Sequence, residues 1–210
     1  DFDFYASTCF ERFGDRVKLW FTFNEPRVYG SQYQGIPFNA FYERAGVNAT
    51  TAPYPVTYNL LKAHGQAVKT YRSLVKSGAI KKGEIALKND DSYPLPQNPD
   101  NADDVEVARR HFDFYIGIFS QPIYGDGNYP QRVLDTIPAS ILPRLTAEDK
   151  ALIKGSADFY AIDAYRTNGA KAVSNLQACI GNITQAEWPV CQGLSATDQY
   201  ATIDGLAIGP

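Results

Sequence analysis

The sequence predicts an α/β fold in which three short strands alternate with amphipathic helices. Apolar and polar residues alternate over residues 17–23, and strand-like stretches follow at residues 83–89 and 157–163. In the long segments between them, apolar residues recur every three or four positions, as on one face of a helix. Because parallel strands need long crossover connections, we expect the three strands to lie parallel and adjacent in sequence order.

Composition and charge are those of a globular protein. The chain has 210 residues, of which 44% are hydrophobic, so it can bury a sizeable core, and its length favours a single domain over residues 1–210. Its formal net charge is −3, which gives no basic footprint for a nucleic-acid partner. No run of roughly 18 apolar residues could cross a bilayer, so no membrane partner is expected.

The first elements expected are a helix over residues 2–13 and a strand over residues 17–23. The apolar residues of the helix have helical spacing, and Gly14 follows where a left-handed cap would end it. Cys9 lies on the apolar face of this helix and is expected to be a buried free thiol. In the strand, the apolar set that alternates with polar or amphipathic residues is Val17, Leu19, Phe21 and Phe23.

Asn24 and Glu25 fall at the carboxyl end of this strand, because Pro26 cannot continue a sheet ladder. A carboxylate at the rim of a sheet, among aromatic rings that raise its pKa by desolvation, is suited to proton donation. The alternative is that Glu25 is a solvated turn residue or a structural ion-pair partner. The spacing alone gives the two interpretations about equal weight.

The central part of the chain is predicted to hold an aromatic loop, a long helix and the second strand. Residues 27–55 lose periodicity and carry aromatic residues among glycines and prolines, as in a loop beside a binding site. A helix from residue 56 to residue 74 follows, and His64 near its apolar face is expected to be a packed or hydrogen-bonded core histidine. The strand over 83–89 ends at Asn89, which by position could reach a substrate. Asp90 and Asp91 after it are expected to serve turns or caps.

The remaining elements are predicted from caps and turn residues. Asn101 can cap a helix whose apolar face continues to residue 119, and a glycine-rich turn follows over residues 124–130. Thr146 can cap a shorter helix, with acidic residues in its first turn. The third strand then runs over residues 157–163, and the rest of the chain is predicted to form a long loop.

Three segments of the chain match one family in order. They are Thr22-Phe23-Asn24-Glu25-Pro26 with residues 9–17 before it, Pro122 with Gly125-Asp126 and Tyr129-Pro130, and Lys154-Gly155-Ser156-Ala157-Asp158-Phe159. Together they resemble glycoside hydrolase family 1, the β-glucosidase family of (β/α)8 TIM barrels, clearly over residues 1–167 and loosely over the tail 168–210. Three ordered matches are far more specific than one pentapeptide.

The resemblance implies an α/β fold that is part of a TIM barrel, covering about strands 4 to 6 with their helices. A complete barrel typically needs about 250 residues. The chain also lacks methionine and any leader at its start, so we expect it to be one incomplete TIM-barrel segment. Its partners would then be the remainder of the parent barrel and a carbohydrate substrate.

The activity implied by the resemblance is that of a retaining β-glycosidase, which hydrolyses O-glycosidic bonds of β-glucosides through a covalent glycosyl intermediate. Glu25 would act as general acid and then as general base, and Asn24 would bond the sugar 2-hydroxyl. Tyr165 matches the tyrosine that supports the nucleophile. The family ends this strand with Asn-x-Tyr, whereas this chain has Asp163-Ala164-Tyr165, so no sugar contact is transferred to Asp163.

The nucleophile itself has no match in this sequence. The family places it in an Ile/Val-Thr-Glu-Asn-Gly stretch on strand seven, and the nearest look-alike, Thr167-Asn168-Gly169, has no Glu. Residues 1–210 alone are therefore expected to be inactive. One rival is a catalytically inactive barrel homologue that binds sugar or a protein, which the retention of Glu25 disfavours. A second rival is a thioglucosidase, whose plant members carry Gln in place of the acid.

Two sequons and two cysteines indicate secretion. Asn48-Ala49-Thr50 and Asn182-Ile183-Thr184 fit N-glycosylation of surface loops, and Cys179 and Cys191 flank the second sequon, where a local disulfide is plausible. The histidines, His64 and His111, lie on different predicted helices, so no metal-site spacing exists. Neither a metal nor a cofactor is expected.

Overall fold

The structure is a computed structural model that describes residues 1–31, 48, 50–90, 93–164, 167–193, 202–203 and 206–207. The chain divides into two compact units. The first comprises Asp1–Asp90, Phe119–Tyr129 and Ala139–Asp163, and the second comprises Asp91–Ile118, Pro130–Pro138 and Ala164–Pro210. The single domain expected over residues 1–210 stays a prediction.

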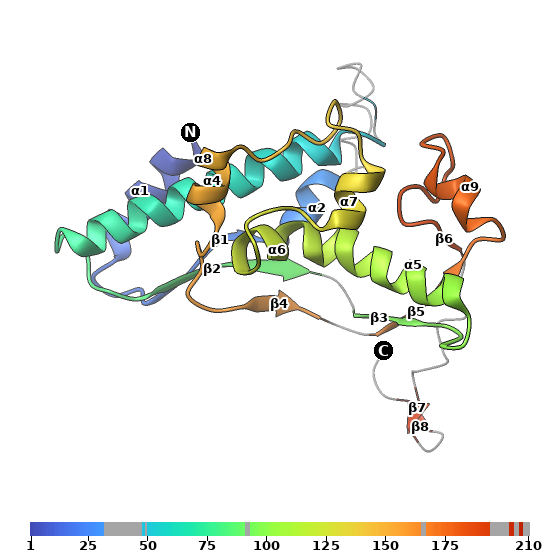
Figure 1. Cartoon of the computed structure of the whole chain (residues 1–210). Helices are drawn as coiled ribbons and strands as arrows, with labels where there is room; N and C mark the ends of the chain where they lie inside the picture. Colours follow the sequence, from blue (N-terminus) through green and yellow to red (C-terminus); the bar gives the residue numbers. More distant parts are fainter. Residues whose placement is uncertain are drawn as a thin grey trace. The chain divides into compact units, whose positions relative to one another are not determined.

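The first unit contains a parallel three-stranded sheet (Figure 1). Its strands are β1 (Leu19–Asn24), β2 (Glu84–Asp90) and β4 (Ala161–Asp163), in the order β1-β2-β4. β2 pairs in parallel with both neighbours. The prediction of adjacent parallel strands in sequence order is therefore confirmed, although β1 begins two residues later than expected and the third strand is shorter.

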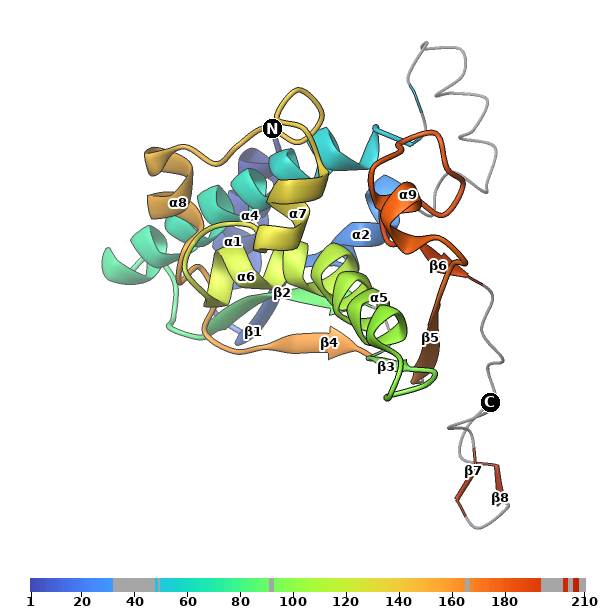
Figure 2. The ribbon, with the colours of Figure 1, turned by 45° about the vertical axis from the view of Figure 1, so that its right-hand side comes forward.

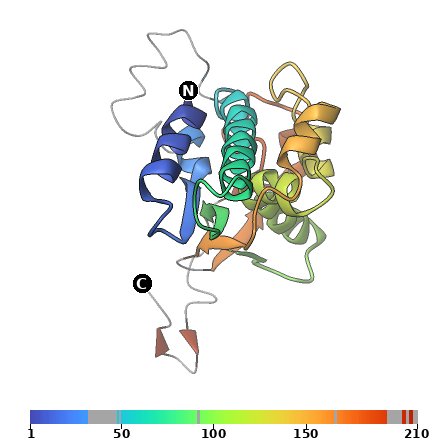
Figure 3. The same cartoon turned by 90° about the vertical axis from the view of Figure 1, so that its left-hand side faces the viewer.

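Three helices of this unit, α1 (Phe2–Phe13), α4 (Pro53–Lys76) and α8 (Ala147–Ile153), lie side by side over one face of the sheet (Figure 3). Phe10 of α1 meets Trp20 of β1 edge to face at 5.0 Å between ring centroids, and Tyr71 of α4 at 5.2 Å. Such aromatic pairs add about 0.5–1.5 kcal/mol each to the gain from area burial. The core around them consists of Ala6, Phe10, Ala67, Val68, Tyr71, Ile80 and Ile85.

The apolar faces expected for α1 and β1 are only partly buried. On α1, Phe13 is 45% exposed and Cys9 is half-buried, so the expectation of a buried thiol is wrong, although Cys9 is free as predicted. In β1, Trp20 packs against the core while Leu19 and Phe21 are 61% and 48% exposed. Alternation separates the two faces of a strand but does not say which of them the helices cover.

Gly14 ends α1, but not as a left-handed cap, because its φ is −68°. A Cβ atom at this position would lie 2.5 Å from the backbone oxygen of Phe10 and 2.8 Å from Cβ of Ile80. Both distances are shorter than van der Waals contact allows. Close approach between segments, and not backbone conformation, therefore explains this glycine.

His64 is fully buried in α4, and its Nδ1 lies 2.7 Å from the Oγ1 atom of Thr22 in β1. Burial lowers the pKa of His64 to about 4, because the charged imidazolium loses its hydration in the core. The prediction of a packed, hydrogen-bonded core histidine is confirmed.

A short helix, α2 (Pro26–Ser31), occupies the start of the segment expected to be a loop. Pro26 is its first residue, a position where the fixed φ of proline suits the helix and its missing N–H is not needed. The expectation of a loop beginning at residue 27 is wrong for this stretch. Residues 32–47 and 49 of the expected loop lie outside the described residues.

The second unit is built around α5 (Ala102–Phe112), which lies against the short strands β3 (Pro94–Pro96) and β5 (Asn168–Ala172) (Figure 2). Asn101 caps α5, since its side chain accepts hydrogen bonds from the backbone N–H groups of Asp103 and Asp104, as predicted. The helix expected up to residue 119 continues through a π-helical turn (Asp113–Gly117) into α6 (Ile118–Tyr124). The extra residue in that turn shifts the buried face.

The tail expected to be a loop contains regular structure. β5 is followed by α9 (Leu176–Ile180), β6 (Gln192–Gly193), β7 (Thr202–Ile203) and β8 (Leu206–Ala207). Long-range polar contacts fix the first part of it: Asp104 accepts a hydrogen bond of 2.8 Å from the backbone N–H of Ala172. The disulfide Cys179–Cys191 is present as predicted. The expectation of a long loop is therefore wrong for the described residues, although the disulfide that was to fasten it is present.

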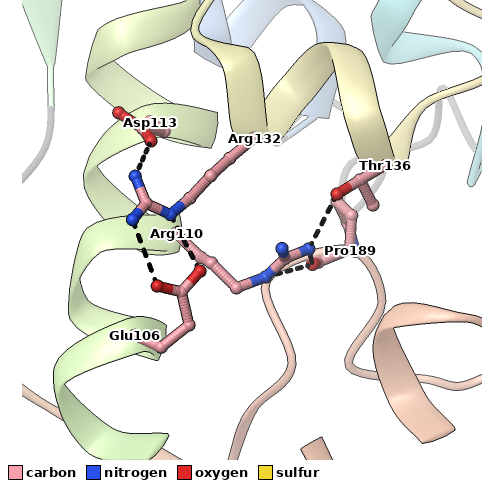
Figure 4. A network of polar contacts seen from close by, with 6 residues as sticks. All are labelled: Glu106, Arg110, Asp113, Arg132, Thr136 and Pro189. Carbon is pink, nitrogen blue, oxygen red and sulfur yellow. Dashed lines mark hydrogen bonds and ion pairs between the residues drawn. The ribbon is translucent and has the colours of Figure 1, made fainter. Parts of the chain in front are cut away.

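Arginine side chains connect α5 to the short helix α7 (Gln131–Thr136) and to the tail (Figure 4). Arg110 donates to the backbone oxygen of Pro189 and, at 3.2 Å, to Oγ1 of Thr136. Arg132 of α7 donates to Glu106 at 2.8 Å and to Asp113 at 3.0 Å. Sequence periodicity did not predict α7. In the first unit, the predicted Thr146 cap of α8 is confirmed as a reciprocal pair with Asp149.

Candidate active site

The carboxyl ends of β1, β2 and β4 bring charged residues together at one edge of the first unit's sheet. Glu25 directly follows β1. Asp90 is the last residue of β2, with Lys88 two positions before it, and Asp163 is the last residue of β4. In the register of the parallel sheet, Asn24 is opposite Lys88, and Asp90 is opposite Asp163. This edge is where parallel sheets usually place their functional groups.

The backbone of Glu25 is in the left-handed region, with φ at 52°. Its N–H donates a 2.8 Å hydrogen bond to the backbone oxygen of Lys88, which continues the ladder for one residue beyond β1. A non-glycine residue in this conformation costs roughly 1–2 kcal/mol, and such residues cluster at functional sites. The surrounding sheet therefore holds the Glu25 side chain at an angle that a regular strand would not give it.

Lys88 and Asp163 form an ion pair across β2 and β4. The Nζ atom of Lys88 is 2.7 Å from Oδ2 of Asp163, and each side chain is 25% exposed. The same ammonium group lies 5.8 Å from the centre of the Phe21 ring. The contact is partly shielded from water, so it is stronger than an exposed pair.

Asp90 is buried and paired with Arg27 of α2. The Nε atom of Arg27 lies 3.0 Å from Oδ2 of Asp90, and the two side chains are 15% and 8% exposed. Asp90 was expected to serve a turn or a cap, and that expectation is wrong, because the residue ends a strand as a buried ion-pair partner. Asp91 lies outside the described residues.

The pKa of Glu25 is raised above the usual range for glutamate. Desolvation by burial is the largest cause, and a hydrogen bond with the Asp163 carboxyl is the second. The negative charges of Asp90 and Asp163 raise the pKa further, while the positive charge of Lys88 opposes them. A carboxyl group that keeps its proton at higher pH can serve as a general acid near neutrality.

The other predicted site residues are placed differently. Asn24 is exposed beside Glu25 at the end of β1. Asn89 is only 1% exposed, and its Nδ2 donates to Oγ of Ser120 in α6 at 3.1 Å. Since neighbours in a strand point to opposite faces, Asn89 faces α6 while Lys88 points to the other face of the sheet. Tyr165 lies outside the described residues.

Both sequon asparagines form a local hydrogen bond with the threonine two positions later. Asn48 is exposed, and its Oδ1 accepts a 2.8 Å hydrogen bond from the N–H of Thr50. Asn182 is half-buried, and its Oδ1 accepts from the N–H of Thr184 at 3.0 Å. Glycosylation at either asparagine stays a prediction.

Neither a metal site nor a membrane span is found in the part of the chain that the structure describes. No group of three or more His, Cys, Asp or Glu side chains there could hold a metal ion. No helix there is both long enough and apolar enough to cross a bilayer.

Lys88 and Asp163 were not singled out from the sequence as a functional pair. One signal was available for Lys88, which is a charged residue inside a strand whose neighbours Ala86 and Leu87 are apolar and fully buried. A charge in such a place needs a partner. The partner could not be found from spacing, because 75 positions separate the two residues.

Comparison with known proteins gives a consistent result. The model of glycosyl hydrolase family 1 matches residues 1–197. The cytosolic β-glucosidase of Cavia porcellus is 36% identical over 196 residues, which are 89% of this chain and 40% of the relative. This chain thus spans about 40% of the length of such curated relatives.

Solved structures agree with the sequence comparisons. A family 1 β-glucosidase from the fungus Humicola insolens in complex with glucose superposes with a TM-score of 0.72 at 31% identity, covering 83% of this chain and 37% of that one. A rice β-glucosidase mutant in a covalent complex with Glc gives a TM-score of 0.69 at 31% identity over 86% of this chain and 40% of that one. The described residues are thus a partial α/β segment of a TIM-barrel fold, without a closed barrel among them.

Proposed function

Because the chain belongs to glycosyl hydrolase family 1, we propose that it carries the acid/base half of the active site of a retaining β-glycosidase. The observation that carries the proposal is the Glu25 carboxyl group at the carboxyl edge of the sheet, with a left-handed backbone and a raised pKa. Both features suit a group that must hold a proton and aim it at one atom.

In the first step, protonated Glu25 gives its proton to the glycosidic oxygen while the bond from that oxygen to the anomeric carbon breaks. A carboxylate nucleophile outside residues 1–210 forms the new bond to the anomeric carbon. In the second step, ionised Glu25 takes a proton from water, whose oxygen attacks the anomeric carbon and releases the nucleophile. Glu25 thus returns to its protonated form after each turnover.

Substrate contacts are proposed for three further residues. Asn24, exposed beside Glu25, would bond the sugar 2-hydroxyl, and Tyr165 would support the nucleophile. Asn89 has weaker support, because its side chain is buried against α6 and bonded to Ser120. The substrate is proposed to be a β-glucoside, in keeping with the glucose complexes of the structurally similar enzymes.

Secretion and N-glycosylation at Asn48 and Asn182 are also proposed. The disulfide Cys179–Cys191 supports an oxidising compartment, although the guinea-pig relative is described as cytosolic. Treatment of the natural protein with a peptide N-glycosidase should lower its mass and convert both asparagines to aspartates. An unchanged mass would contradict the proposal.

The acid/base role is tested with Glu25→Gln in the protein at its natural length. Turnover of alkyl glucosides, which need a protonated leaving group, should fall by about 10²-fold or more. Aryl glucosides whose leaving groups need no proton should lose less at the glycosylation step, and azide should restore their turnover by attacking the intermediate without a base.

Asn24→Asp is a matched control, because it alters the neighbouring side chain without removing the acid and should affect both classes of glucoside alike. Equal losses on both classes in Glu25→Gln, together with no azide rescue, would contradict the assignment. Glucoside binding without any turnover in the unaltered protein would instead favour an inactive barrel homologue that binds sugar.

A further inference from the structure

A groove of about 320 Å³ lies between α4 and α8 of the first unit, which are neighbours over the sheet (Figure 3). Its floor is formed by buried or half-buried residues: Gly65 and Val68 of α4, Leu152 of α8, and Ser156. A Cβ atom at Gly65 would lie 2.9 Å from the backbone oxygen of Leu152, so the glycine lets the two helices approach closely here. The volume is at the lower end of the range for small-molecule sites, about 300–1,000 Å³.

The rim of this groove is positively charged. It is formed by Lys69, Arg72 and Lys76, which recur at helical spacing along one face of α4, and by Lys154 directly after α8. All four residues are exposed, and of the described residues that line the groove none is acidic. The whole chain has a net charge of −3, so positive charge is concentrated here against the overall balance. Such a rim attracts anions.

A row of lysines on a helix is usually part of a solvated face on which acids alternate with bases. α4 departs from that pattern, because its 24 residues include four lysines and arginines but no Asp or Glu. The ion pair of Arg72 with Asp158, at 3.0 Å, neutralises one charge of the rim. Within the described part of the chain, no ion pair is found for Lys69, Lys76 or Lys154. Their ammonium groups are therefore available to a ligand.

Helix ends explain two of these lysines but not the third. Lys76 is the last residue of α4 and Lys154 follows α8, and a cation at a helix C-terminus offsets the helix dipole. Lys69 lies about two turns before the end of α4, where the dipole gives it no such role. The backbones of Lys69 and Lys76 are about 10 Å apart along the axis, since each residue rises about 1.5 Å. A linear chain of phosphate groups spans this distance, whereas a single phosphate would have to draw both side chains to one point.

We propose that this groove binds a small linear polyanion that carries two or more phosphate groups. The ammonium groups of Lys69, Lys76 and Lys154 contact its oxygens, and charge-assisted hydrogen bonds of this kind are stronger than neutral ones. Arg72 bonds Asp158 through Nη2, and its guanidinium has further N–H donors for a phosphate oxygen. Several cations on one rim suit a ligand with several negative charges, and the apolar floor leaves room for a short organic group.

The groove is separate from the candidate active site. Asp158, the partner of Arg72, accepts a 3.0 Å hydrogen bond from the N–H of Ile85, the second residue of β2. The groove therefore lies near the amino ends of the strands, whereas Glu25 follows the carboxyl end of β1. It also lies between two helices of this chain and not at β1 or β4, the open edges of the sheet where further strands of a barrel would join. Binding there goes beyond the proposed glycosidase activity and does not depend on it.

The test is isothermal titration calorimetry of the protein at its natural length with inorganic tripolyphosphate. Binding should saturate, and inorganic phosphate should bind at least about tenfold more weakly, because it cannot contact the rim at several points at once. Lys69→Gln should weaken tripolyphosphate binding by about two- to five-fold, the effect of one exposed ion pair. Lys69→Gln combined with Lys76→Gln should weaken it by about tenfold. Lys69→Arg keeps the charge and should bind as the unaltered protein does.

The matched control combines Lys18→Gln with Lys81→Gln, at exposed residues that precede β1 and β2 and do not line the groove. It changes the net charge as much as the double variant of the rim does and should leave binding unaltered. Glutamine is a good helix former, so the variants of α4 should fold, and their melting temperatures check this. Glu25→Gln should bind tripolyphosphate normally, so failure of the acid/base role leaves this test intact.

Three results would overturn the inference. The first is no saturable binding up to about 1 mM tripolyphosphate. The second is equal binding by the unaltered protein and the double variant of Lys69 and Lys76, which would place the ligand elsewhere. The third is equal weakening in the control with Lys18 and Lys81, which would mean that tripolyphosphate responds to net charge alone.

Discussion

Glu25 in the first unit and Asp113 in the second both have a pKa raised chiefly by burial, but their hydrogen-bond partners act in opposite directions. Asp113 accepts a 3.0 Å hydrogen bond from Arg132, which stabilises its negative charge and lowers its pKa against the effect of burial. The Asp163 carboxyl group acts on Glu25 in the opposite direction and raises its pKa further. A cation beside an acid favours its ionised form, whereas a second acid favours its protonated form.

The backbone shows the same contrast. Asp113 lies in helical conformation, with φ at −65°, whereas Glu25 has a φ of 52°. Arg132 in turn bonds two acids on the continuous helical segment, Glu106 and Asp113, so its role is explained by holding α7 against that segment (Figure 4). Among the described residues, a left-handed backbone and a shifted pKa coincide at Glu25, which is why we propose the active site at this edge.

The largest expected effect on stability is that of Arg27→Met at the sheet edge. It removes one ion-pair partner of the buried Asp90 carboxylate, and breaking a buried ion pair from one side costs about 3–5 kcal/mol. Urea unfolding at pH 7 measures the change in free energy. Asp90→Asn in the Arg27→Met background should recover part of the loss. A loss below about 1 kcal/mol would show that the pair is no more than a surface contact.

A second expected effect concerns His64, whose pKa is shifted chiefly by burial and not by a neighbouring acid. His64 has a folded-state pKa of about 4, below the unfolded value, so the unfolded chain binds more protons between these values. The free energy of unfolding should therefore fall by up to about 3 kcal/mol as the pH drops from about 6.5 to 4. The proper control is His64→Asn, which cannot titrate and should show a flatter slope over this range. Identical slopes would mean that His64 does not become protonated on unfolding.

A smaller effect is expected in the second unit. Arg132→Met removes hydrogen bonds to two acids but leaves partly exposed groups, so it should cost about 1–2 kcal/mol in urea unfolding. The pH dependence of kcat/KM should be unchanged in this variant. A shift on its basic side would show that Arg132 influences the pKa of Glu25, and would contradict the distinction between the two clusters.

Local patterns in the sequence were enough to predict α1, α4, α5 and α8, because their apolar spacing and cap residues act within a few positions. They also predicted the strand order, since each crossover is long enough to be helical. They did not predict β5 or the contacts of the tail, which depend on bonds to distant residues such as Asp104 with Ala172 and Arg110 with Pro189. α2 was missed although Pro26 at its first position was a usable signal.

The candidate site was predicted to a similar extent. The motif Thr22-Phe23-Asn24-Glu25-Pro26 placed Glu25 at the strand end, where the structure has it. Neither the left-handed backbone of Glu25 nor the pair of Lys88 with Asp163 could be predicted, because both arise from the register between strands. Asn89 was assigned from its position alone, and the alternation of side chains along β2 turns it toward α6 instead.

The most direct measurement is a titration of the Glu25 carboxyl group by carbon-13 NMR, with Glu25→Gln used to assign its signal in the protein at its natural length. We expect an apparent pKa above the usual glutamate value, about 4.3, because desolvation and the Asp163 carboxyl group favour the protonated form. The same signal should titrate at lower pH in Asp163→Asn. A value at or below the usual one, unchanged by that substitution, would contradict the central claim that this edge keeps a proton on Glu25.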